Sequence, residues 1–321
     1  MRRWNLSHYA ISSCVTAALL AGCGGSQPPI GAPGAMRQTR AIGTHAQRGG
    51  SWMLLEAKRK DLLYASSLHR IDVFSYPTGR RVGKLRIGYD IGGLCSDPKG
   101  DVFVDAGAKV FEYEHGGTDP IAIVKSKFGF PFQCAFDPTT GNLAVISTID
   151  SGPEHITIYK NVTGKAEEYE DYGPFYSFFG CVYDGGGNLF VTGYTDALGE
   201  LPKGADAFIN YKPSLKTDES VLAGIQWDGK YVTVQEVPPD KHHALLDRIT
   251  ITHKKATVVS RTELAGNQIR FKWLYSGVAI GFEGQNHHAI GFWLYPAGGG
   301  TVKVLSSYGI KFDAATISVA P

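Results

Sequence analysis

The chain has 321 residues, of which 43% are hydrophobic and only 19% are charged, and it contains 40 glycines. This mixture is typical of one large domain or two ordinary ones built from short strands and tight turns. The net charge is +2, and loss of Arg2 and Arg3 with a signal segment would make basic and acidic residues equal in number. A formally neutral chain with no Lys/Arg cluster argues against nucleic acid as a partner.

The first 22 residues have the pattern of a lipoprotein signal peptide. Two arginines form a positive n-region, and the apolar stretch 9–20 is too short to span a bilayer. It ends in Leu20-Ala21-Gly22-Cys23, which resembles the lipobox of bacterial lipoproteins. The resemblance implies acylation of Cys23 and anchoring to the membrane by several acyl chains. Gly24, in place of aspartate, favours the outer membrane in a Gram-negative cell. The alternative is an ordinary secretory signal with a coincidental cysteine.

Residues 23–50 are rich in Gly, Pro, Ser and Gln and show no periodicity, which indicates a flexible tether. We therefore expect three parts along the chain. These are a signal peptide over 1–22, a lipidated tether over 23–50 and a folded domain over 51–321.

Beyond the tether, the chain repeats a turn that is followed by an apolar strand. The turn has the pattern Asp-x-x-Gly, as in Asp97-Pro-Lys-Gly100-Asp-Val-Phe-Val104, and it recurs at Asp137, Asp184 and, in shorter form, Asp228. The Asp carboxylate accepts backbone hydrogen bonds and Gly supplies a positive φ, as a hairpin turn requires. Successive turns are 40, 47 and 44 residues apart. That spacing holds the four short strands of one propeller blade.

A second repeated piece is an apolar strand that ends in tyrosine. It occurs as Val73–Tyr76, Val110–Tyr113, Ile156–Tyr159, Phe208–Tyr211 and Phe292–Tyr295. With strands labelled a to d from the axis outward, the units span about 89–128, 129–175, 176–222, 223–266 and 267–309.

The remaining unit is split between the two ends of the domain. Residues 61–88 supply strands b, c and d, and the segment 314–321 supplies the missing strand a, which closes the ring. The sequence therefore predicts an all-β fold, a six-bladed β-propeller of four-stranded antiparallel blades whose first blade is closed by the C-terminal strand. The alternative is a pair of β-sandwiches.

The element Asp184-Gly-Gly-Gly187-Asn-Leu-Phe-Val191 resembles those of NHL-repeat and SMP-30/gluconolactonase-like propellers, and of related six-bladed lipoproteins. The resemblance covers most of residues 60–321 and implies the fold, but little about the chemistry. The lactonases of this family hold a divalent metal through a Glu, two Asn and an Asp around the axis. Those four positions have no match in this sequence, so lactonase activity is not expected.

Histidines gather in the predicted b–c loops, on the face where propellers usually bind ligands. Imidazole suits both metal binding and acid–base chemistry near neutral pH. The chain has no HxH or HExxH spacing, and exposed polar loops are the alternative interpretation. The candidate metal ligands are His69, His242, His243, His287 and His288, with His155 in a further loop and Asp150, Glu154, Asp240, Glu283 and Asn286 nearby.

The predicted crossovers into the third and fourth units are aromatic. They read Phe128-Gly-Phe-Pro-Phe132 and Tyr172-Gly-Pro-Phe-Tyr-Ser-Phe-Phe179. Such rings can stack on sugars or grip an apolar peptide, and they can also pack neighbouring blades together. The candidates for ligand contact are Phe130, Phe175 and Tyr176.

Three cysteines, Cys95, Cys134 and Cys181, occupy equivalent strand-a positions. Small apolar side chains suit the crowded axis, and an odd count argues against a disulfide framework. Taken together, the sequence predicts an exported, membrane-anchored binding or interaction module of the cell envelope, with a protein or glycan partner and no cofactor. The alternative is a hydrolase or lyase that uses the histidine loops with a divalent metal.

Overall fold

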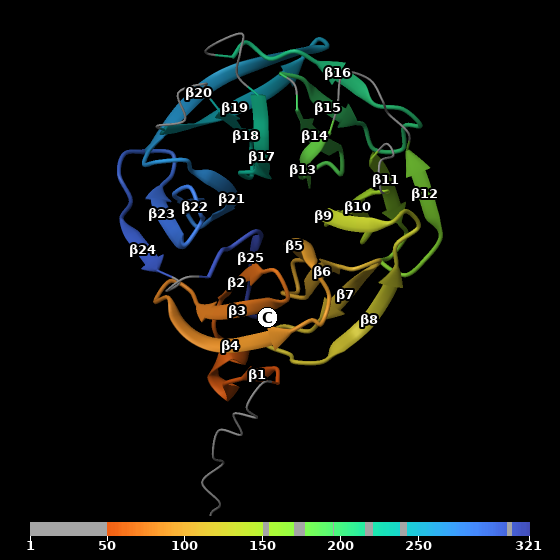
Figure 1. Ribbon diagram of the computed structural model, residues 1–321. Helices are drawn as coiled ribbons and strands as arrows, with labels where there is room; N and C mark the ends of the chain where they lie inside the picture. Colours follow the sequence, from red (N-terminus) through yellow and green to blue (C-terminus); the bar gives the residue numbers. More distant parts are fainter. Residues whose placement is uncertain are drawn as a thin grey trace, which may run out of the picture. The chain divides into compact units, whose positions relative to one another are not determined.

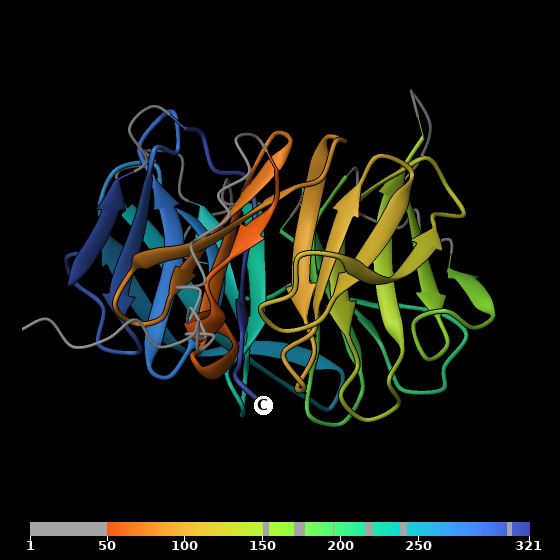
Figure 2. The ribbon, with the colours of Figure 1, turned by 90° about the horizontal axis from the view of Figure 1, so that it is seen from below.

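The computed structural model describes residues 50–149, 154–169, 177–194, 196–215, 221–237, 243–306 and 310–321. The predictions for the signal peptide, Cys23 and nearly all of the tether lie outside these residues. The described chain forms a β-propeller of six blades arranged around a central axis (Figure 1). In a view turned by 90°, the strands of each blade run between the two faces of the ring (Figure 2).

Each blade is an antiparallel sheet whose strand a lies nearest the axis. Blade 2 contains β5 (Ile91–Ser96), β6 (Val102–Ala106), β7 (Lys109–Tyr113) and β8 (Pro120–Lys125). Blade 3 contains β9 (Phe130–Phe136), β10 (Leu143–Thr148), β11 (Glu154–Tyr159) and β12 (Ala166–Tyr169). Blade 4 contains β13 (Phe178–Tyr183), β14 (Leu189–Gly193), β15 (Leu198–Leu201) and β16 (Ile209–Tyr211). Blade 5 contains β17 (Val221–Trp227), β18 (Val232–Val237), β19 (His243–Thr252) and β20 (Lys255–Ala265). Blade 6 contains β21 (Arg270–Tyr275), β22 (Val278–Glu283), β23 (Ala289–Leu294) and β24 (Lys303–Ser306).

Blade 1 joins the two ends of the domain. Its inner strand is β25 (Ala315–Ser318), followed by β2 (Leu62–Ser67), β3 (Arg70–Ser75) and β4 (Arg80–Arg86). The short strand β1 (Trp52–Met53) adds to the outer edge of β4, and a 3₁₀ turn, η1 (Leu55–Arg59), leads into β2. The predicted propeller, with its first blade closed by the C-terminal strand, is therefore confirmed.

The Asp-x-x-Gly turns connect strand a to strand b. In blade 2 one carboxylate oxygen of Asp97 accepts hydrogen bonds from the backbone N–H groups of Lys99 and Asp101, at 2.9 and 2.8 Å. Gly100 has φ +89°, a conformation that side chains with a Cβ rarely adopt. The repeated sequence motif is therefore the turn at the inner edge of blades 2 to 5.

The core is divided into clusters that lie between neighbouring blades. Trp293 of blade 6 is fully buried and packs with Leu246 and Leu264 of blade 5. Tyr64 of blade 1 packs in the same way against Val104 of blade 2. Burial of each such side chain stabilises the fold by about 1.5–3 kcal/mol. This inter-blade packing explains why the b strands read as nearly continuous apolar runs.

The repeated tyrosine does not end the same strand in every blade. Tyr211 ends strand d of blade 4 and pairs with Leu198, whereas Tyr113 and Tyr159 end strand c of blades 2 and 3. The expectation for the cysteines was wrong. Cys95 and Cys134 form a disulfide, with their Cα atoms 5.6 Å apart, while Cys181 is free and buried. The two bonded positions are equivalent in adjacent blades, and adjacent a strands converge near the axis, so the odd count did not prevent pairing. No described helix has the length and apolar character to cross a membrane.

Candidate functional site

A pocket of about 470 Å³ opens on the propeller axis. Inner strands of all six blades line it, and β17 and β21 contribute the largest share. These strands surround the axis in Figure 1. Its volume falls within the range of about 300–1,000 Å³ that is typical of small-molecule sites. The pocket is therefore the candidate binding site of the described chain.

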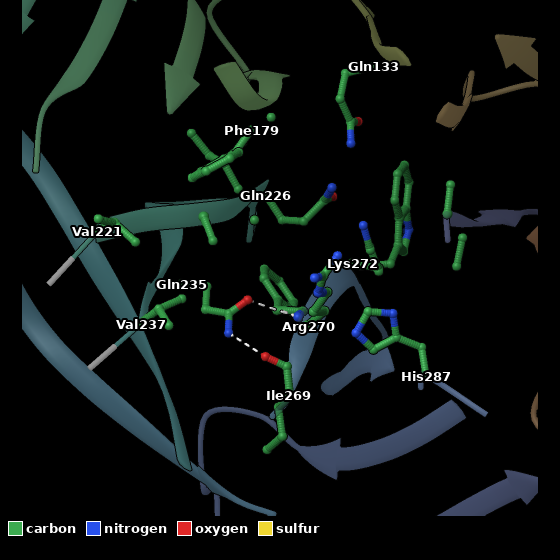
Figure 3. Close-up of a pocket in the computed structure, with 18 of the residues that line it drawn as sticks. Gln133, Phe179, Val221, Gln226, Gln235, Val237, Ile269, Arg270, Lys272 and His287 are labelled. Atoms are coloured by element: carbon green, nitrogen blue, oxygen red, sulfur yellow. Dashed lines mark hydrogen bonds between the residues drawn. The ribbon is translucent and has the colours of Figure 1, made fainter. Parts of the chain in front are cut away.

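One wall of the pocket is basic. Arg270 and Lys272 come from β21, and His287 comes from the β22–β23 loop (Figure 3). Among the described residues that line the pocket there is no aspartate or glutamate. Within the described chain, neither basic group of β21 has an ion-pair or hydrogen-bond partner for its side chain. The nearest specific contact is the ring of Phe282, whose centroid lies 5.8 Å from the Lys272 ammonium.

A β-bulge in β21 places Lys272 outside the regular ladder. Phe271 pairs with Gly281 and Trp273 pairs with Ile280, so Lys272 is an extra residue with no partner on β22. Bulges of this kind redirect side chains and are frequent beside functional sites. Blade 4 contains the corresponding irregularity, where Phe179 is the extra residue of β13 and also lines the pocket.

A buried glutamine fixes the backbone around Arg270. The Gln235 side chain, 2% exposed, donates a hydrogen bond to the carbonyl of Ile269 at 2.7 Å and accepts one from the N–H of Phe271 at 2.9 Å (Figure 3). Strand b of blade 5 therefore holds the start of strand a of blade 6 in place. This arrangement presents the basic residues to the axis.

The buried position of these groups changes their pKa values. Burial, reinforced by the nearby Arg270, lowers the pKa of Lys272 from 10.5 to about 8. Burial also lowers the pKa of His287 to about 4, with further contributions from Arg270 and Lys311. The His287 imidazole is therefore neutral at neutral pH. Its Nδ1 atom is buried and has no hydrogen-bond partner among the described residues.

The rest of the pocket wall combines aromatic rings and amides. Phe179 contacts Tyr194 edge to face, with ring centroids 5.8 Å apart, and Trp273 lies on the side of blade 6. The side chains of Gln133 and Gln226 reach into the space from blades 3 and 5 (Figure 3). The site thus offers positive charge, amide hydrogen bonds and apolar surface to one ligand.

The structure brings two of the histidines proposed as metal ligands to the pocket and places two others elsewhere. His243 and His287 line the pocket. His69 is exposed beside Asp90, with Nδ1 3.0 Å from the carboxylate, and Nδ1 of the exposed His288 lies 2.8 Å from the carbonyl of Ile310. His242 lies outside the described residues. Within those residues no group of three or more His, Cys, Asp and Glu side chains is placed to hold a metal ion.

One aromatic candidate lies at the start of strand a of blade 3. Phe130 is 50% exposed at the first position of β9. Phe128 instead stacks on the His155 imidazole, with ring centroids 3.9 Å apart. Phe175 and Tyr176 lie outside the described residues. Phe132 packs against the core between blades 3 and 4, so the crossover 128–132 offers one exposed ring and two packed rings.

Sequence analysis missed the two strongest features of the pocket, Arg270 and Lys272. The signal lay in the run Arg270-Phe-Lys-Trp273, which opens a predicted strand a and places two cations beside two aromatic residues with no acid between them. A search for clustered Lys and Arg along the chain overlooks two cations that become important only because they face an enclosed axis.

No family model matches the chain, and no curated protein does either. Several solved structures share its fold. A chain of a nidogen/laminin complex is 15% identical, with a TM-score of 0.63, and the match covers 81% of this chain and 99% of that one. A protein of unknown function from Bacteroides caccae is 14% identical, with a TM-score of 0.59 and the same coverage. The β-propeller domain of Myceliophteria thermophila Cps50 (Swd1) is 12% identical, with a TM-score of 0.54, and the match covers 80% of this chain and 86% of that domain. At these identities the likeness shows the β-propeller fold alone.

Proposed function

We propose that this protein is a lipid-anchored binding module of a bacterial cell envelope that takes up its ligand in the axial pocket. The pocket carries the proposal, because it is enclosed by inner strands and combines convergent polar groups with apolar walls. The anchor rests on the Leu-Ala-Gly-Cys23 sequence, and the relation to NHL-repeat and SMP-30-like propellers rests on the repeated turn element.

The disulfide supports export. Cys95 and Cys134 are bonded across two neighbouring blades. Disulfides form and persist in oxidising compartments, and they are rare in the reducing cytosol of most bacteria. A bonded pair in the propeller therefore agrees with a domain that works outside the cytoplasm.

An envelope protein or glycan is the proposed larger partner. Phe130 offers an exposed ring where the chain enters β9, and it is the described residue that we assign to this contact. No arrangement of the described residues specifically favours the metal-dependent hydrolase or lyase. Binding is therefore the function that the geometry supports best.

Ligand uptake can be tested by thermal unfolding of the full-length protein in detergent, with panels of neutral sugars, organic cations and organic anions. We expect at least one class to raise the melting temperature, and a pocket-filling Gln226→Trp variant to lose that response. Ile121→Trp, at an exposed position of β8, is the control. A wild-type response that persists in Gln226→Trp would show that the ligand binds elsewhere.

The anchor is tested separately. Metabolic labelling with a fatty acid should mark the wild-type protein and leave Cys23→Ser unlabelled. Equal labelling of both proteins would disprove lipid attachment at Cys23.

A further inference from the structure

We propose that the axial pocket binds the carboxylate or phosphate group of a small organic anion, with Arg270 and Lys272 as its charged contacts. This inference deepens the proposed function and rests on the same pocket. It adds the chemical class of the ligand, which the fold alone does not indicate.

The charge of the pocket wall is uncompensated. Arg270 and Lys272 stand two residues apart on β21 and have no ion-pair partner within the described chain. Lys272 is half-buried, whereas Arg270 beside it is exposed. A cation partly removed from water is normally paired, because an unpaired charge in that position is unfavourable, and Lys272 lacks such a partner. Here two cations stand side by side, and Arg270 lowers the pKa of Lys272 rather than relieving its charge. An anion between them would supply the missing partner.

The nearest acidic groups do not cancel this charge. Asp313 acts on Lys272, but the Lys311 ammonium lies 3.8 Å from the same carboxylate. Asp105 acts on Cys181 of the pocket wall, yet it is fully buried, and burial raises its pKa to about 8. Asp105 therefore holds its proton more readily than an exposed aspartate and contributes less negative charge at neutral pH. The pocket stays positive when these neighbours are counted.

The donor groups fit a carboxylate or a phosphate. A guanidinium presents a planar fork of N–H donors that matches two oxygens of either group, and an ammonium adds a point charge. His287 and the amides of Gln133 and Gln226 face the same space and supply further hydrogen-bonding groups (Figure 3). His287 lines the pocket, and its buried Nδ1 has no hydrogen-bond partner among the described residues.

The remaining space fits an organic body. Phe179 and Tyr194 form an aromatic wall on blade 4. Figure 3 shows Phe179 away from the basic residues of blade 6. A volume of about 470 Å³ exceeds what an inorganic ion fills. We therefore expect a ligand with an anionic head at blade 6 and a ring or chain against Phe179.

Isothermal titration of the full-length protein in detergent at neutral pH tests this inference. The anionic probes are benzoate, hexanoate, phenyl phosphate and glycerol 3-phosphate, which separate carboxylate from phosphate and ring from chain. Benzamide and benzylamine are the neutral and cationic counterparts of benzoate. Inorganic phosphate carries the anionic group without an organic ring or chain. We expect at least one organic anion to bind at least about tenfold more tightly than benzamide, benzylamine and inorganic phosphate.

Variants locate the binding. Lys272→Met and Arg270→Gln should each weaken anion binding by about tenfold or more, because each removes a charge-assisted contact. Lys125→Met removes an exposed lysine at the end of β8 and should have no effect. Circular dichroism of each variant confirms folding. Equal loss in Lys125→Met would contradict a local role for the two basic residues.

The possible failures can be told apart. If benzamide or benzylamine binds and Gln226→Trp blocks it, while no anion binds up to roughly 10 mM, the anion inference is wrong and the pocket remains a ligand site. If inorganic phosphate binds as tightly as phenyl phosphate, the inference that an organic ring or chain contributes to binding is wrong. If no probe binds, and the broader panel gives no response that Gln226→Trp removes, both proposals fail.

Discussion

Gln235 on β18 accepts a hydrogen bond from the backbone N–H of Phe271 on β21, across the interface between blades 5 and 6. The same side chain donates to the carbonyl of Ile269, so one amide holds the backbone on both sides of Arg270. A single hydrogen bond of the same kind links blades 4 and 5, since the Thr192 hydroxyl of β14 donates to the carbonyl of Ala223 on β17. Inter-blade hydrogen bonds of this kind fix the pocket wall.

We predict that Gln235→Leu lowers the free energy of unfolding by about 3 kcal/mol, because it leaves two buried backbone groups without a partner. Gln226→Leu is the matched control, since Gln226 also lines the pocket but its side chain has no hydrogen-bond partner within the described chain. Urea denaturation of both variants measures the difference. Equal destabilisation would show that the Gln235 hydrogen bonds contribute little.

The fold was predictable because its signals are local and repeated. Each Asp-x-x-Gly turn is specified by a few adjacent residues, and the spacing between turns gives the blade length. The split first blade was also visible, because residues 61–88 lack a strand that the segment 314–321 supplies. These features depend on turn chemistry and periodicity, which a single sequence displays directly.

The pocket was not predictable in the same way. Lys272 and Phe179 lie 93 positions apart in the chain, and bulges in two different blades bring both to the axis. A bulge depends on one extra residue in a ladder, and neither strand shows it in its pattern. The pairing of Cys95 with Cys134 also depends on which blades are neighbours. Which residues meet at the axis therefore depends on the order of the blades in the closed propeller.

The disulfide should contribute measurably to stability. It links residues 39 positions apart, and loss of a crosslink over such a loop costs about 3–4 kcal/mol. We predict this loss for the double variant Cys95→Ala, Cys134→Ala under non-reducing conditions. Cys181→Ala, at the equivalent position of blade 4, removes only a buried thiol and should cost about 1 kcal/mol. Guanidinium denaturation with and without reductant measures both effects, and similar losses in the two variants would argue against the crosslink.

Anion binding should weaken in alkaline solution. The pKa of Lys272 is lowered to about 8 by burial and by Arg270, whereas Asp313 acts in the opposite direction. The Lys272 side chain is therefore charged below pH 8 and loses its proton and its charge above it. The affinity for the anion should fall as pH rises through 8. Lys272→Arg keeps a permanent charge and should retain its affinity above that pH. Titration calorimetry across this range compares the two proteins, and coincident profiles would mean that another group controls binding.

The same lysine should make the free energy of unfolding rise with pH, whereas it makes the affinity for the anion fall. In the unfolded chain its pKa returns to about 10.5, so between pH 8 and 10.5 the unfolded state holds a proton that the folded state has released. The free energy of unfolding therefore gains a contribution that rises with pH across this window. Lys272→Met should remove that rise. Urea denaturation at several pH values detects it as a flatter curve, and a curve parallel to the wild type would contradict it.

Acid should destabilise the propeller through His287. Burial, Arg270 and Lys311 lower its pKa to about 4, whereas the unfolded chain regains a value near 6.5. Between these limits the unfolded state binds a proton that the folded state does not, so the free energy of unfolding falls as pH drops from 6.5 to 4. His287→Asn should reduce this fall, and asparagine tolerates the φ of +50° at this position.

His253→Asn provides the matched control for His287→Asn. His253 has the same φ of +50° but is exposed, in the turn between β19 and β20. Its substitution should leave the acid dependence of the wild type in place, because His253 does not line the pocket. Unfolding curves recorded at several pH values between 6.5 and 4 compare the three proteins. If His287→Asn and His253→Asn both follow the wild type, the pocket histidine is not held neutral by burial, and the hydrogen-bonding role assigned to its imidazole at the anion site would have to be withdrawn.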